Sequence, residues 1–214
     1  APRPPPEPKI TVSVTRSAVA QGEFIVVRCT FDGGDPAEAA VEGLGAKTRL
    51  HVEDGKTFCL LPVSVAAKPG THVITAAATW PSGIKKSAAV EVSVARTNFE
   101  VSRITASKEQ TDAITEQKLA QDAVKVRAAK AASEPTRLWL SGFQLPLEAK
   151  VTTGFGHVRY VNGVETWRHS GIDFGAPAGT KVGACADGKV VLATTLNGTG
   201  NTVILDHGLN VFSS

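Results

Sequence analysis

The first half of the chain alternates apolar and polar positions with the period of β-strands. In "ITVSV" (10–14) and "VEVSV" (90–94), every second side chain is apolar, so these side chains would share one face of a sheet. Turns rich in Gly, Pro, Asp and Ser separate four further short runs: "FIVVRCTF", "TRLHVE", "KTFCLLPVSV" and "THVITAAATW". Six or seven strands at this spacing predict an antiparallel β-sandwich over residues 9–96, immunoglobulin-like in its general layout.

Residues 97–136 lose this alternation and predict a helical connector. The stretch "SKEQTDAITEQKLAQDAVKVRAAKAASEP" (107–135) is rich in Ala, Gln, Glu and Lys. Ser107 followed by Gln110 fits a capping box at its start, and Pro135 supplies a stop. The apolar positions of this helix, which we expect to be buried, are Ile114, Leu119, Val124 and Val126.

Short strand patterns return in residues 137–214. "KVVLA" and "NTVILDHG" are each bounded by turn residues. The predicted fold class is therefore mainly β: a Pro-rich linker (1–8), a sandwich domain (9–96), the helical connector (97–136) and a second antiparallel β domain (137–214).

Composition narrows the class of protein. The 214 residues are 42% hydrophobic and 20% charged, with a net charge of +3 and no run of Lys or Arg, so nucleic acid is not an expected partner. No apolar run approaches the ~18 residues of a membrane helix. Five of residues 1–8 are proline and the chain opens without a Met, which is typical of a stiff linker behind an anchor or export signal.

Cysteine and most histidine positions give no clear site. No pair among Cys29, Cys59 and Cys185 has C-x-x-C spacing, which disfavours a cysteine zinc site. Cys29 and Cys59 lie in predicted strands and could form a disulfide or remain as two buried thiols. His51 and His72 stand alone in strand patterns, and we expect structural or surface roles for them.

The stretch "TWRHSGIDFGAPAGT" (166–180) places His169 four residues before Asp173. In a straight strand these side chains would be ~13 Å apart, at ~3.3 Å per residue. Two ligands of one metal ion must lie much closer, since each bond is about 2 Å. The pair can bind one ion if the chain bends at Ser170–Gly171, a dipeptide that permits it. The spacing alone is a weak indication.

The motifs around His169 and Asp173 are a more specific indication of a metal site than the spacing of the pair. "PLEAKVTTGFGHVR", "HSGIDF", "APAGTKV", "ADGKV" and "NTVILDHG" follow one another over residues 143–214. This segment resembles the lysostaphin/LytM-type zinc metallopeptidases, which cut peptidoglycan peptides. The resemblance implies a small, largely antiparallel β fold with a groove, and a Zn²⁺ ion bound by His169 and Asp173.

The sequence also departs from the family. Family members continue with a Tyr-x-His-Leu segment and a His-x-His pair, which supply the third zinc ligand and the catalytic histidines. Neither is present here, so we expect these residues beyond Ser214, and we expect the chain alone to hold zinc poorly and to be inactive. Arg159 and His207 are the candidates for substrate contact, His157 is a weak alternative ligand, and Trp167 is expected to pack.

The resemblance implies a function for the intact protein. It would be an exported zinc metalloendopeptidase of the periplasm or cell envelope, anchored through a removed N-terminal segment, that hydrolyses peptide bonds of peptidoglycan. The sequence does not identify which peptidoglycan bond would be cleaved. One alternative is a catalytically degenerate LytM-like protein that binds the wall or activates its hydrolysis. Another is an adhesive wall protein built on the immunoglobulin-like module.

Overall fold

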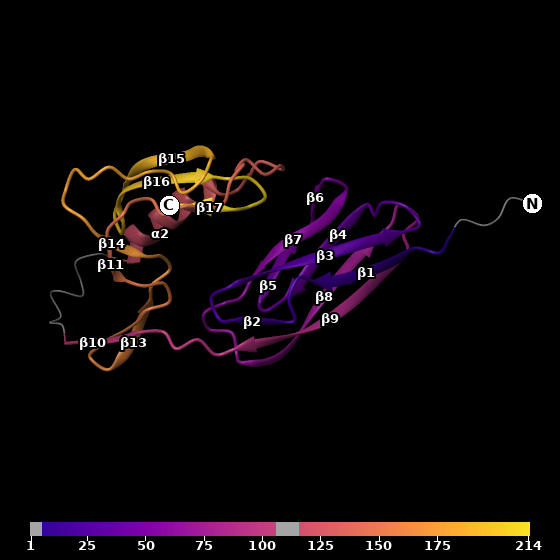
Figure 1. The fold of residues 1–214 in the computed structure, drawn as a ribbon, viewed down its shortest axis with the longest axis horizontal. Helices are drawn as coiled ribbons and strands as arrows, with labels where there is room; N and C mark the ends of the chain where they lie inside the picture. Colours follow the sequence, from indigo (N-terminus) through magenta and orange to yellow (C-terminus); the bar gives the residue numbers. More distant parts are fainter. Residues whose placement is uncertain (1–5, 106–115) are drawn as a thin grey trace, which may run out of the picture. The chain divides into compact units, whose positions relative to one another are not determined.

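The structure of the chain is a computed structural model that describes residues 6–105 and 116–214, with only the backbone at positions 116, 166 and 167. The chain divides into two compact units, Ala1–Asn98 and Phe99–Ser214, each traced in Figure 1. Strands dominate both units, which confirms the predicted mainly β class. Within the described ranges, no helix is both long and apolar enough to span a membrane.

Two sheets make up the first unit. One has the strand order β1-β3-β7-β6 and the other β2-β9-β8-β4-β5. All pairings are antiparallel except β2 with β9. The strands are β1 (Lys9–Val14), β2 (Ala18–Ala20), β3 (Phe24–Asp32), β4 (Glu38–Gly43), β5 (Ala46–Arg49), β6 (His51–Glu53), β7 (Lys56–Pro62), β8 (Gly70–Thr79) and β9 (Lys85–Ala95).

Alternate side chains of both sheets fill one shared core. Ile25, Val27 and Cys29 of β3 are buried, whereas the residues between them are exposed or half-buried, as the period of two predicts. Cys59 lies in the same core, and both cysteines are free thiols. Burial raises the pKa of Cys29 to about 11 and that of Cys59 to about 12. Of the two interpretations left open by the sequence, a disulfide or two buried thiols, the structure contains the two buried thiols.

Three small sheets and one helix form the second unit. The sheets have the orders β10-β12-β13, β11-β14 and β15-β16-β17. The elements are β10 (Val101–Ile104), α2 (Glu116–Ala129), β11 (Lys150–Thr153), β12 (Val158–Val161), β13 (Val164–Arg168), β14 (Asp173–Gly175), β15 (Lys189–Leu196), β16 (Gly200–Asp206) and β17 (Phe212–Ser213). Its buried residues, among those described, include four hydrophobic and four polar side chains, which are Val158, Leu196, Ile204, Leu209, Asp122, His169, Asp206 and His207.

The segment predicted as a helical connector contains a strand. β10 pairs in parallel with β12, and Val101 lies opposite Val158. The helix is described only from Glu116, so the capping box at Ser107 and the apolar position Ile114 lie outside the described residues. Four residues such as "VSRI" carry too little pattern to indicate a strand, because β10 owes its conformation to its pairing with β12.

Helix α2 contacts the β15–β16 turn through a buried carboxylate and through the side chain of Leu119, which lies against Gly198. Leu119 and Val124 are 47% and 65% exposed, whereas Asp122 is buried. The Asp122 carboxylate accepts hydrogen bonds of 2.9 Å from Asn197 Nδ2 and 2.8 Å from the Gly198 amide, in the turn between β15 and β16. The prediction that Leu119 and Val124 are buried is therefore wrong, whereas Val126 is half-buried. Asp122 is buried instead because the β15–β16 turn offers its carboxylate two N–H donors.

The role of Asp122 can be tested by substitution. Asp122→Ala leaves the Asn197 amide and the Gly198 N–H without their acceptor, so we expect the free energy of unfolding to fall by about 1–3 kcal/mol. Val124→Ala on the same helix is the matched control, with an expected change within about 0.5 kcal/mol because its side chain is exposed. Denaturant titration followed by circular dichroism measures both. Equal losses would contradict a polar anchor.

Candidate metal centre

Backbone hydrogen bonds hold His169 at the end of the β12–β13 hairpin. Its amide donates to the His157 carbonyl at 2.9 Å, and its carbonyl accepts from the Gly156 amide at 2.7 Å. Four residues later Asp173 begins β14, whose partner strand is β11. Between them the chain bends, and residues 170–172 belong to no strand. The bend expected around Ser170–Gly171 brings the two side chains together.

The imidazole of His169 is fixed in a defined orientation. Nδ1 lies 3.1 Å from the carbonyl oxygen of Gly154, which can only accept, so Nδ1 carries the proton in this contact. Nε2 faces Asp173, 3.1 Å from Oδ1. The His169 side chain is 9% exposed and that of Asp173 is 54% exposed, so the pair has a buried side and a solvent side.

This arrangement fits a metal ion. With its proton on Nδ1, a neutral imidazole presents a lone pair at Nε2, and the facing carboxylate oxygen also presents one. Two acceptors at 3.1 Å repel unless a cation, either a proton or a metal ion, sits between them. Ligand atoms about 2.0–2.1 Å from a tetrahedral zinc ion are about 3.3 Å apart, close to the observed separation.

The other predicted residues do not join this pair. Among the described residues, no group of three or more His, Cys, Asp and Glu side chains could hold a metal ion. His157 Nδ1 lies 3.5 Å from the Glu100 carboxylate instead. Arg159 is half-buried on β12, in register with Trp167 of β13. The substrate role of Arg159 stays a prediction, and the packing role of Trp167 concerns a side chain outside the described part.

His207 is an interior residue of the structure. Its side chain is fully buried, Nδ1 contacts the Asp187 carbonyl at 2.8 Å and Nε2 contacts Ser213 Oγ at 2.8 Å. The Phe143 ring packs against it edge to face, with 5.0 Å between centroids. The described contacts therefore enclose the ring, and the substrate contact of His207 stays a prediction. Of the other histidines, His51 packs against Phe58 and His72 hydrogen-bonds to the Lys68 carbonyl.

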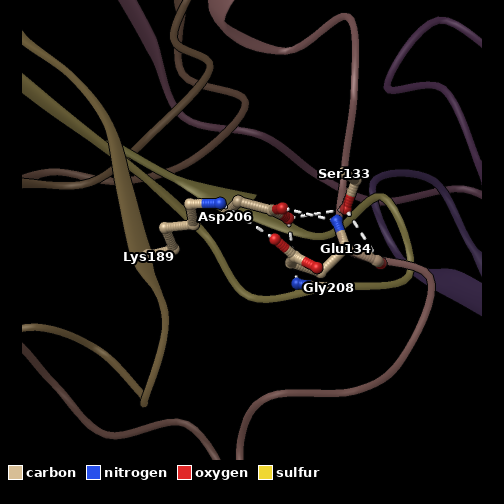
Figure 2. A network of polar contacts seen from close by, with 5 residues as sticks. All are labelled: Ser133, Glu134, Lys189, Asp206 and Gly208. Atoms are coloured by element: carbon tan, nitrogen blue, oxygen red, sulfur yellow. Dashed lines mark hydrogen bonds and ion pairs between the residues drawn. The ribbon is translucent and has the colours of Figure 1, made fainter.

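A polar cluster beside His207, which the sequence patterns did not indicate, ties the chain after α2 to the end of β16 (Figure 2). The buried Asp206 carboxylate accepts hydrogen bonds from Ser133 Oγ at 2.6 Å, from the Glu134 amide at 2.7 Å and from the Gly208 amide at 2.9 Å. Lys189 Nζ pairs with the Glu134 carboxylate at 3.0 Å. These contacts fix residues 133–134 against the turn that follows β16.

Glycine is required at position 208 in this cluster. Gly208 has a φ of +85°, and a Cβ there would overlap the carbonyl oxygen of Thr136. Further backbone bonds join the same two segments: the Leu209 amide donates to the Glu134 carbonyl and the Leu138 amide to the His207 carbonyl, both at 2.9 Å. The "DHG" sequence of 206–208 is therefore a docking point for residues 133–138.

Part of the second unit matches a known family. Residues 167–214 match the family described as Peptidase family M23, which confirms the resemblance inferred from the sequence motifs for this part of the chain. The chain is 40% identical over 63 residues to "DD-carboxypeptidase/endopeptidase Mpg" of Neisseria meningitidis serogroup B, a match that covers 29% of this chain and 14% of that protein. It is 41% identical over 66 residues to an uncharacterized protein of Haemophilus influenzae, covering 31% and 15%. The matches thus span about one seventh of these relatives' length.

Similarity to solved structures is low. An endo-beta-1,4-mannanase from Thermotoga petrophila superposes with a TM-score of 0.34 at 12% identity, over 42% of this chain and 20% of that one. The titin domains z1z2 give 0.30 at 16% identity, over 46% and 56%. Scores at this level support no conclusion about fold or function.

The pKa of Asp206 makes the stability of this cluster depend on pH. Burial raises the pKa, but the hydrogen bonds from Ser133, Glu134 and Gly208 and the neighbouring His207 together outweigh burial, and the pKa lies below its usual value. A lowered pKa in the folded state stabilises the fold above the unfolded pKa of about 3.9, and this stabilisation is lost as the pH falls through the folded pKa.

We expect Asp206→Asn to be less stable than the parent at pH 7 and to lose less stability between pH 5 and pH 2. Denaturant midpoints at several pH values measure both effects. Asp35→Asn, at an exposed position of the first unit, is the control and should keep the parent's pH profile. A parallel loss in Asp206→Asn and the parent would contradict the assigned role of the carboxylate.

Proposed function

Because residues 167–214 carry part of a LytM-type M23 peptidase domain, we propose that the protein is a zinc metalloendopeptidase that hydrolyses peptide bonds of peptidoglycan. The relative named as an endopeptidase supports this proposal. In line with that substrate, we propose that the protein acts outside the cytoplasm, in the periplasm or cell envelope.

The His169–Asp173 pair carries the proposal. Its two facing acceptors are 3.1 Å apart, one of them on an imidazole fixed through Nδ1 by the Gly154 carbonyl. A metal-bound histidine commonly donates a hydrogen bond from its second ring N–H to a backbone carbonyl or a carboxylate. This hydrogen bond sets the tautomer and the direction of the metal-binding nitrogen. The pair is therefore arranged to bind before any metal arrives. This arrangement also disfavours a purely adhesive or degenerate wall-binding protein, which has no use for it.

The described residues supply ligands and position them. His169 offers Nε2 from a buried ring, and Asp173 offers its carboxylate from the solvent side. These two residues would hold the zinc ion, which when bound would supply Lewis-acid chemistry to polarise the scissile carbonyl and activate water near neutral pH. We propose that the third ligand and the general acid–base histidine come from outside these 214 residues. Arg159 is the proposed contact for a carboxylate of the peptide.

Zinc titration of the chain tests this assignment. We expect the parent to bind zinc weakly, and His169→Ala and Asp173→Ala each to weaken binding by more than about tenfold, because even outer-shell changes at metal sites cost 10–100-fold. His72→Ala is the control, because its ring hydrogen-bonds to Lys68 in the other unit. Isothermal calorimetry with Zn²⁺ gives the affinities. Unchanged affinity in both ligand variants would overturn the assignment.

A further inference from the structure

We propose that β10 and the residue before it, Phe99–Ile104, form a positioning segment for the zinc ligand His169. This inference rests on the proposed zinc site. The segment begins at the first residue of the second unit, directly after the N-terminal unit ends at Asn98. Phe99 precedes His169 by 70 positions in the sequence. In the fold, both residues contact the same short segment, residues 154–157.

The position of His169 depends on residues 154–157. Three polar atoms of His169 bond to this short segment: its amide to His157, its carbonyl to Gly156 and its Nδ1 to Gly154. A shift of residues 154–157 therefore moves both the backbone of His169 and the direction of its Nε2. Metal sites tolerate little such movement, since ligand atoms must stay near their bonding distances.

Residues 154–157 are held in turn by the Phe99 ring. Gly156 is buried with a φ of +76°, and a Cβ at this position would overlap the Phe99 ring. Phe99 thus packs directly against the Gly156 backbone. Phe99 also packs against Phe155 in a T-shaped arrangement, with 6.5 Å between the ring centroids. Aromatic pairs of this geometry contribute about 0.5–1.5 kcal/mol beyond the area they bury.

A parallel ladder between β10 and β12 begins beside this contact. The Val158 amide donates to the Glu100 carbonyl at 2.8 Å, and the register continues to Ile104, opposite Val161. The Glu100 carboxylate lies 3.5 Å from His157 Nδ1, but its side chain is 80% exposed, so this ion pair adds little. The Phe99 ring and the Glu100 carbonyl therefore carry the positioning, one on each side of His157.

The first residues of the second unit thereby gain a role in the site. Strand β10 pairs with β12, and β12 pairs with β13, which ends one residue before His169, so metal binding depends on Phe99 although Phe99 is no ligand. A purely structural strand would support the stability of the unit as a whole. A positioning segment has an additional effect on zinc affinity and on the exchange of the His169 amide.

The test compares Phe99→Ala with Ile104→Ala, a truncation at the far end of the same strand, where the side chain is 45% exposed. We expect Phe99→Ala to raise the Kd for Zn²⁺ about tenfold, the usual cost of losing support behind a metal ligand. We also expect faster hydrogen exchange at the amides of His169 and Gly156. Ile104→Ala should keep both within about twofold, and Phe99→Leu should restore most of the affinity.

Each outcome is decisive. Folded Phe99→Ala with the parent's zinc affinity and amide protection overturns the inference, and so does an equal loss in Ile104→Ala. Where Phe99→Ala does not fold, Phe99→Leu and Phe99→Val replace it, and affinity must fall with the size of the side chain. A parent chain that binds no zinc overturns the proposed function instead, and amide exchange at His169 then still tests the positioning.

Discussion

The second unit depends on buried polar side chains whose hydrogen bonds are satisfied. Its apolar interior is small, so burial of Asp122, Asp206 and His207 must be compensated by bonds to specific partners. Asp122 anchors the helix, Asp206 anchors the segment after it, and His207 bonds through both ring nitrogens. The bonds of Asp122 and Asp206 join residues more than 70 positions apart in sequence, and they fix α2 and the segment after it against β15, β16 and the turns that follow these strands.

His169 follows the same principle with a different result. Its backbone and Nδ1 are satisfied by residues 154–157, which leaves Nε2 directed at the Asp173 carboxylate. Among the described contacts, the buried His169 ring therefore faces a carboxylate oxygen through Nε2. A cation between the two atoms, either a proton or a metal ion, makes this approach favourable, and the metal ion is the case that we propose.

Periodicity and motifs predicted the part of the structure that local patterns determine. The long strands of the first unit followed from alternation, and the close approach of His169 and Asp173 was expected from the bend at Ser170–Gly171. Their role as zinc ligands stays a proposal. The strand β10 and the burial of Asp122 did not follow, because each depends on a partner remote in sequence. A carboxylate such as Asp122 is indistinguishable from a solvated residue until its donors on the β15–β16 turn are known. Asp206 likewise lies in the family motif "NTVILDHG", but the motif does not reveal its donors at residues 133–134.

The most direct measurement is a long-range ¹H–¹⁵N correlation spectrum of the histidine rings before and after Zn²⁺ is added. The account predicts that the His169 resonances show a proton on Nδ1 in both states, and that the Nε2 resonance alone moves to a metal-bound position. The other four rings should keep their resonances. Zinc bound through Nδ1 of His169, or zinc bound with no change at His169, would contradict the account.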